Sequence, residues 1–167
     1  MGMRAIYRAI TDQELANVIK RTDGENWGEI KDDEVCDIDK MWDALHFLLT
    51  GRSAMEVGMV AAEDELISQA ILGHQMLSGE DVEEFTAGSD SNKVKEIAIA
   101  LEKLDFEEYM EMFNMVNFAE NEIYPDIWEY EDEEDEIKED LECCFENLRD
   151  FYARMSERGL GVYISIC

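Results

Sequence analysis

Apolar side chains recur at steps of three and four residues over much of this chain, which is the spacing of one face of an α-helix. The pattern is clearest near the C-terminus, where it predicts a helix from about Glu133 to Arg158 that Gly159 closes. Acidic residues crowd the start of this segment and arginines lie toward its end, so its charges complement the helix dipole. The acidic run at residues 131–136 therefore has a structural explanation.

Shorter helices are predicted where the same spacing follows a capping residue. Thr11 and Glu14 have the spacing of a capping box at the start of one apolar stripe. A second helix is predicted over Asp37–Gly51, with Asp37 as its N-terminal cap and Gly51 as its end. Three more are expected over Glu63–Ile71, from the cap region Ser89–Ser91 to Leu104, and from Asp105 to Phe113.

Strands are expected near the two ends of the chain. Met3–Ile10 is rich in β-favouring residues, and Val162–Cys167 alternates between polar and apolar side chains. A strand over Ile71–Leu77 has a weaker pattern, and residues 21–34 show no sustained period and are interpreted as a loop. A connecting helical stretch should end at Pro125, because proline disfavours helical geometry in the residue before it.

Length and composition fit one core. The chain has 167 residues, of which 46% are hydrophobic, so it is long enough to bury a substantial interior but short for two domains. Together with the elements above, this predicts an α+β fold. We expect a mainly helical single domain over residues 1–167, with a small sheet that includes the N- and C-terminal strands, paired or side by side.

The charge narrows the possible partners. The 42 acidic and 14 basic residues give a formal net charge of -28, which repels nucleic acid and anionic membranes. We therefore expect no direct binding to either. Such acidity most often serves solubility through self-repulsion. It is also compatible with a basic protein partner or with mimicry of a polyanion.

The cysteines and the N-terminus favour the cytoplasm. Cys36, Cys143, Cys144 and Cys167 lack a Cys-x-x-Cys spacing, so free thiols are expected rather than a metal or disulfide site. Neither a signal peptide nor an apolar run long enough to cross a membrane is present in the sequence. No glycine-rich phosphate loop, nucleophile turn or calcium loop occurs, and no cofactor is expected.

The candidate catalytic residues are Asp39, Asp43, His46 and Tyr124. Ideal helical geometry places Asp39, Asp43 and His46 within an arc of roughly 60°, where they could bind a divalent metal or perform acid–base chemistry. The structural alternative is that His46 hydrogen-bonds at the core margin while the aspartates cap, pair or face water, and this alternative is favoured. Tyr124, beside Pro125, either lines a pocket or anchors a loop on the core.

The second histidine offers a further metal hypothesis. His74 could meet His46 in space if the short central strand packs on the helix that carries His46. Neither a His-x-x-x-His nor a Glu-x-x-His spacing accompanies the pair, so a two-histidine site is disfavoured.

Several motifs resemble those of one bacterial family. The segments Asp37–Lys40, Trp42–Asp43, Leu45–Phe47 and Leu49–Gly51 look like the YfbM-like family, a domain of unknown function (DUF 1877). The opening Met-Gly-Met, the Leu101–Asp105 stretch, Glu122–Pro125 and the long helix before a C-terminal strand resemble it in the same order. The resemblance covers essentially the whole chain. It implies a compact α+β fold but no established activity, substrate or cofactor.

Three hypotheses for function follow. The leading one is a cytoplasmic module that binds a protein or a small ligand and is not expected to be an enzyme, with a basic protein as its expected partner. The first alternative is a hydrolase or metal-dependent enzyme that uses Asp39, Asp43 and His46. The second alternative is a polyanion mimic. The sequence leaves the oligomeric state unassigned.

Overall fold

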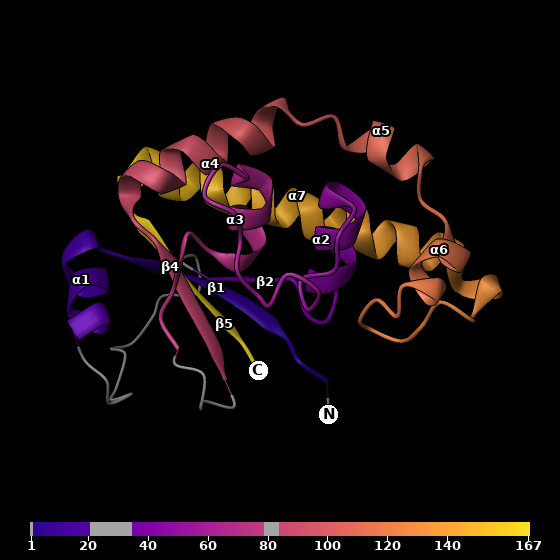
Figure 1. Ribbon diagram of the computed structural model, residues 1–167. Coiled ribbons are helices and arrows are strands. Elements are labelled where there is room, and N and C mark those ends of the chain that lie inside the picture. Colours follow the sequence, from indigo (N-terminus) through magenta and orange to yellow (C-terminus); the bar gives the residue numbers. More distant parts are fainter. Residues whose placement is uncertain (1, 21–34, 79–83) are drawn as a thin grey trace.

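A computed structural model describes residues 2–20, 35–78 and 84–167 of the chain. The sequence forms a five-stranded antiparallel sheet in the order β2-β1-β5-β4-β3, together with a layer of helices (Figure 1). The elements are β1 (Ala5–Ile10), α1 (Asp12–Lys20), β2 (Val35–Asp37), α2 (Trp42–Thr50), α3 (Leu66–Leu72), β3 (Gln75–Met76), β4 (Phe85–Ser89), α4 (Ser91–Lys103), α5 (Phe106–Glu111), α6 (Met115–Glu120), the 3-10 turn η2 (Glu131–Glu133), α7 (Glu134–Arg158) and β5 (Gly161–Ile166).

The two terminal strands form the centre of the sheet. β1 and β5 pair along their whole length, with Tyr7 opposite Ile164 and Arg8 opposite Tyr163. Because side chains alternate across a strand, Tyr7 and Ile164 face the helical layer while Arg8 and Tyr163 face the other way. Helices α2, α3, α4 and α7 gather on the first side, and α1 lies apart from them (Figure 1). The predicted α+β fold with paired terminal strands is confirmed.

Two buried tyrosines fasten the sheet and α7 to α3. The Tyr7 hydroxyl donates to the carbonyl of Ile71 at 2.9 Å, and the Tyr152 hydroxyl donates to the carbonyl of Ala70 at 2.7 Å. The last carbonyls of a helix have no partner within the helix, so these bonds satisfy groups that burial would otherwise leave unmet. Burial raises the pKa of both phenols, which stay protonated as donors.

Several of the predicted helix boundaries are confirmed. Thr11 and Glu14 form the capping box, with bonds of 3.1 and 3.2 Å in the two directions. Asp90 caps α4 by accepting from the backbone of Lys93 at 2.8 Å. Gly51 and Gly159 end α2 and α7 in the left-handed conformation that glycine adopts without steric cost.

The predicted helix over Asp37–Gly51 begins too early. Asp37 is the last residue of β2, which pairs with β1, and α2 starts only at Trp42. The Asp37 carboxylate bonds to Arg4 and accepts from the backbone of Asp39 at 2.8 Å instead of capping the helix. Asp39 itself has a φ of +49°, which interrupts right-handed helical geometry.

Other boundaries also shift. The helix expected at Glu63–Ile71 is α3, which begins at Leu66, and the weak strand over Ile71–Leu77 shrinks to the two residues of β3. The stretch before Pro125 leaves helical geometry at Glu120. Asp105 occupies the cap position of α5 without a capping bond. The loop expected at 21–34 lies outside the described residues. No helix within the described ranges is both long and apolar enough to cross a membrane.

Candidate functional site

Asp43 is a buried carboxylate whose acceptor positions are occupied. It lies in the first turn of α2 and is 1% exposed. Its oxygens accept from the backbone N–H of Ala54 at 2.6 Å, from the backbone N–H of Tyr124 at 3.0 Å, and from the hydroxyl of Ser53 at 3.0 and 3.1 Å. A carboxylate surrounded by fixed donors holds loops together. Asp43 thus joins α2 to the segments at 53–54 and at 124.

His46 is sealed one turn further along α2. It is fully buried, and its Nδ1 lies 2.7 Å from the carbonyl of Arg52. Since a carbonyl only accepts, Nδ1 carries the proton, and Nε2 accepts from the Ser68 hydroxyl at 2.7 Å. Burial lowers the pKa of His46, and the hydrogen bond to Arg52 and the charge of Asp43 offset this only in part. Both ring nitrogens are therefore already used inside the protein.

Asp39 does not join these two residues. Its carboxylate is 60% exposed and forms an ion pair with Arg4 at 3.1 Å. The expected arc over Asp39, Asp43 and His46 assumed one continuous helix, and this is wrong because α2 begins at Trp42. Within the described ranges, no group of three or more His, Cys, Asp or Glu side chains is placed to hold a metal ion.

Tyr124 packs beside this network as an anchor. Its ring lies 5.5 Å from the ring of Trp42 between centroids, and the Tyr124–Pro125 peptide bond is cis. The hydroxyl is buried, and no described residue hydrogen-bonds to it. A Cβ added at Gly2 would lie 2.3 Å from this hydroxyl, so the N-terminal segment covers it closely.

His74 lies in a different environment from His46. It lines a cavity of about 250 Å³ between α1 and the β3–β4 side of the sheet, with Asp12 and Asp90 on its walls. The Nδ1 atom of His74 is buried, and none of the described residues bonds to it. Both carboxylates already accept hydrogen bonds from the first turn of α4, because Asp12 accepts from Ser91 and Asp90 caps the helix. His46 is bonded to α3 and to the loop after α2, so each histidine has its own setting.

A groove runs between the segment before α3 and the side of α4. It has a volume of about 420 Å³ and is lined by three carboxylates, one lysine and two apolar side chains: Glu63, Asp64, Glu96, Lys93, Leu66 and Ile99. Ile99 is 52% exposed although it lies on an amphipathic helix. Sequence reasoning missed this groove. One signal was available, because Ile99 falls outside the apolar stripe formed by Val94, Ile97 and Leu101.

The acidic residues concentrate in one part of the chain. Residues 104–148, which contain α5, α6, η2 and half of α7, hold 18 Asp and Glu but only one Lys or Arg, Lys138. Seventeen of these 18 acidic residues are exposed, and Lys138 already pairs with Glu134 at 2.9 Å. So many like charges create a negative electrostatic potential that the basic side chain of the same region does not cancel.

The four cysteines are free thiols, and two of them have low nucleophilic reactivity. All four lie in the described ranges and none forms a disulfide. Burial raises the pKa of Cys36 and of Cys144 to about 12, so both stay thiols at neutral pH. Neither provides a ready nucleophile.

Taken together, these features define an α+β protein whose helical layer has a mostly hydrogen-bonded polar interior and an acidic exterior. The sequence pattern of a family described as a domain of unknown function (DUF1877) matches residues 1–165. The chain belongs to this family, which confirms the resemblance seen in its motifs.

Two comparisons with relatives agree with this placement. The chain is 29% identical over 163 residues to protein YfbM of Escherichia coli strain K12, covering 95% of each chain. Its fold is similar to the crystal structure of YfbM, a protein of unknown function from Escherichia coli. The TM-score is 0.78 at 26% identity, over 98% of this chain and 99% of the other.

Proposed function

We propose that this protein is a binding module for a basic protein partner. The observation that carries the proposal is the exposed acidic surface of residues 104–148, with 18 acidic residues against one basic residue. A surface of this kind attracts a positively charged partner over distances near the Debye length and speeds its association. Electrostatic complementarity would select the partner.

Exposed apolar side chains within the same region give such a partner more than charge to contact. Met112, Val116 and Tyr130 are 68%, 60% and 54% exposed. Protein interfaces combine apolar or aromatic anchors with a polar rim, and isolated apolar side chains among carboxylates match that composition. A basic partner with apolar contacts of its own therefore fits better than a simple polycation.

The other hypotheses have less support. An enzyme built on Asp39, Asp43 and His46 would need these groups to converge, but Asp39 lies outside on Arg4 and the other two are bonded internally. A polyanion mimic needs carboxylates at regular spacing, whereas residues 131–136 are consecutive acids at the start of α7. In the part of the chain that the structure describes, small-ligand binding is supported by the cavity beside His74. We also place the protein in the cytoplasm, because its four thiols are free.

The test is affinity capture at two ionic strengths. Tagged protein is incubated with bacterial extract at about 50 mM and at about 300 mM salt, which differ strongly in electrostatic screening. We expect a protein of basic isoelectric point to be retained at low salt and released at high salt. Capture of no basic protein, or capture that salt leaves unchanged, would contradict the proposal.

A further inference from the structure

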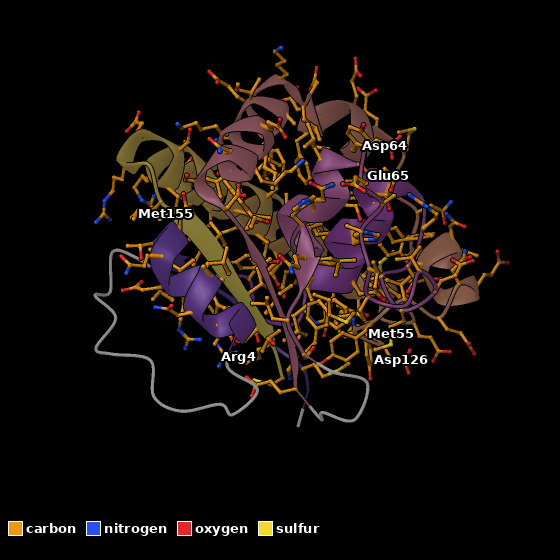
Figure 2. The ribbon with its side chains drawn as sticks, turned by 60° about the vertical axis from the view of Figure 1, so that its left-hand side comes forward. Arg4, Met55, Asp64, Glu65, Asp126 and Met155 are labelled. Atoms are coloured by element: carbon orange, nitrogen blue, oxygen red, sulfur yellow. The ribbon has the colours of Figure 1, made fainter. Side chains whose placement is uncertain are left out.

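We propose that the groove between residues 63–66 and α4 is the docking site for a basic segment of the partner that carries one apolar side chain. This inference rests on the proposed function and gives the same partner a second contact, which lies outside the acidic surface of residues 104–148. Asp64 and Glu65 lie next to each other on the outer edge of the helical layer, away from α1 (Figure 2). The approach to the groove is therefore on the outside of the helices.

The floor of the groove is apolar. Leu66 and Ile99 line it, and Ile99 is 52% exposed. The neighbouring Val94, Ile97 and Leu101 are fully buried and already complete the packing of α4. Ile99 is thus not needed for the core, and a partner side chain that covers it would remove apolar surface from water.

The rim of the groove is acidic. Glu63 and Asp64 stand on one side and Glu96 on the other. The single cation, Lys93, is already paired with Glu96 at 3.0 Å, so Glu63 and Asp64 have no cation within the groove to neutralise them. Lysine or arginine beside an apolar side chain is the chemistry that complements an apolar floor between carboxylates.

The rim segment is fixed in place before any partner binds. The Gln69 side chain is fully buried, and its Nε2 donates to the carbonyls of Ala62 and Glu63 at 2.9 and 2.8 Å. Arg52 forms an ion pair with Glu65 at the end of the same segment. A pre-formed groove loses little conformational freedom on binding, which favours affinity.

The experiment uses a defined probe and the full chain. The probe is a five-residue capped peptide with two lysines on each side of one leucine, titrated into the protein by calorimetry at about 50 mM salt. We expect binding to wild type. The variant Ile99→Ser should bind roughly tenfold more weakly, because the leucine loses its apolar contact. The double variant Glu63→Gln/Asp64→Asn should bind at least about fivefold more weakly.

Matched controls separate the groove from charge in general. Glu84→Gln/Glu157→Gln removes two exposed carboxylates that lie outside both the groove and residues 104–148, and Met55→Ser removes an exposed apolar side chain that also lies outside both. Both should bind the peptide within about twofold of wild type. A urea unfolding curve of each variant checks that it is folded. A peptide with glycine in place of leucine should bind wild type as weakly as the leucine peptide binds Ile99→Ser.

The outcomes distinguish this inference from the proposed function. If the two double variants that remove carboxylates weaken binding equally and Ile99→Ser has no effect, the groove is excluded as the docking site while a basic partner remains supported. If wild type does not bind the peptide at all, the groove proposal is overturned, and the capture experiment decides the proposed function separately. If only the groove variants lose binding, the inference holds.

Discussion

The first turns of α2 and the groove beside α4 both carry carboxylates, yet the two regions differ in what surrounds those carboxylates. The oxygens of Asp43 accept hydrogen bonds from two backbone amides and one hydroxyl, all inside the protein. Glu63 and Asp64 of the groove are exposed, and the nearby Lys93 is paired with Glu96. Acidic side chains of equal charge therefore have opposite roles in these two places.

Under the proposed function, unused bonding capacity, rather than residue type, distinguishes a binding surface from a structural one. An aspartate near a buried histidine has the composition of a catalytic site. In α2, however, each of these groups already has internal partners, so little capacity remains for a substrate. In the groove, charge and apolar area remain open to solvent, where a partner can reach them.

The largest expected effect comes from removing Asp43. Asp43→Ala leaves the amides of Ala54 and Tyr124 and the hydroxyl of Ser53 buried without an acceptor. We expect the free energy of unfolding to fall by about 3 kcal/mol or more, measured by urea denaturation. Asp39→Asn is the matched control, since it removes an exposed charge and asparagine tolerates positive φ. It should change stability by less than about 1 kcal/mol. Equal losses of stability in Asp43→Ala and Asp39→Asn would contradict a structural role that is specific to the buried carboxylate.

A smaller effect is expected from pH. Burial lowers the pKa of His46 in the folded protein. Its stabilising contribution is therefore complete above the unfolded-state pKa, about 6.5, and is lost as the pH falls toward the folded-state pKa. The chain has two histidines, so His74→Gln leaves His46 as the only one. We expect the unfolding free energy of His74→Gln to fall between about pH 7.5 and 5.5.

A second variant, which also lacks His46, completes this test. Adding His46→Gln to the His74→Gln variant should lower the unfolding free energy at both pH values but remove most of its decrease between them, because no imidazole is left to titrate. An unchanged pH slope in this double variant would show that the buried histidine is not its source.

The smallest effect is predicted for Tyr124. Its hydroxyl is buried without a hydrogen bond from any described residue, so Tyr124→Phe removes no bond while it keeps the ring on Trp42. We expect the unfolding free energy to stay within about 0.5 kcal/mol of wild type or to rise. A loss of more than about 1 kcal/mol would reveal a partner for the hydroxyl and place Tyr124 with Asp43 among the satisfied groups.

Local patterns were enough to predict part of the fold. The apolar period of α7 and the left-handed cap at Gly159 follow from the residues themselves, as does the capping box of Thr11 and Glu14. The strand β4 was missed, because its core-facing residues Ala87 and Ser89 are small and give no apolar alternation. Pairing with β5, a contact distant in sequence, makes that segment a strand.

The candidate site depended on contacts that no local pattern contains. Asp37 has the chemistry of a helix cap, but pairing of β2 with β1 and the ion pair with Arg4 hold it in the sheet. The start of α2 consequently moves to Trp42, and the helical arc assumed for Asp39 disappears. His46 is hydrogen-bonded within the protein, as the structural alternative expects. Its partners Arg52 and Ser68 could not be named from the sequence, because they are fixed by the packing of α2 on α3.

One measurement tests the contrast between the two regions most directly. The leucine and lysine peptide is titrated into isotope-labelled protein, and the shift of each backbone amide is followed by NMR. We expect the largest changes at residues 63–66 and 93–99, while the amides of 43–54 and of Tyr124 stay nearly unchanged. Changes centred on 43–54 and Tyr124, with none along the groove, would contradict this expectation.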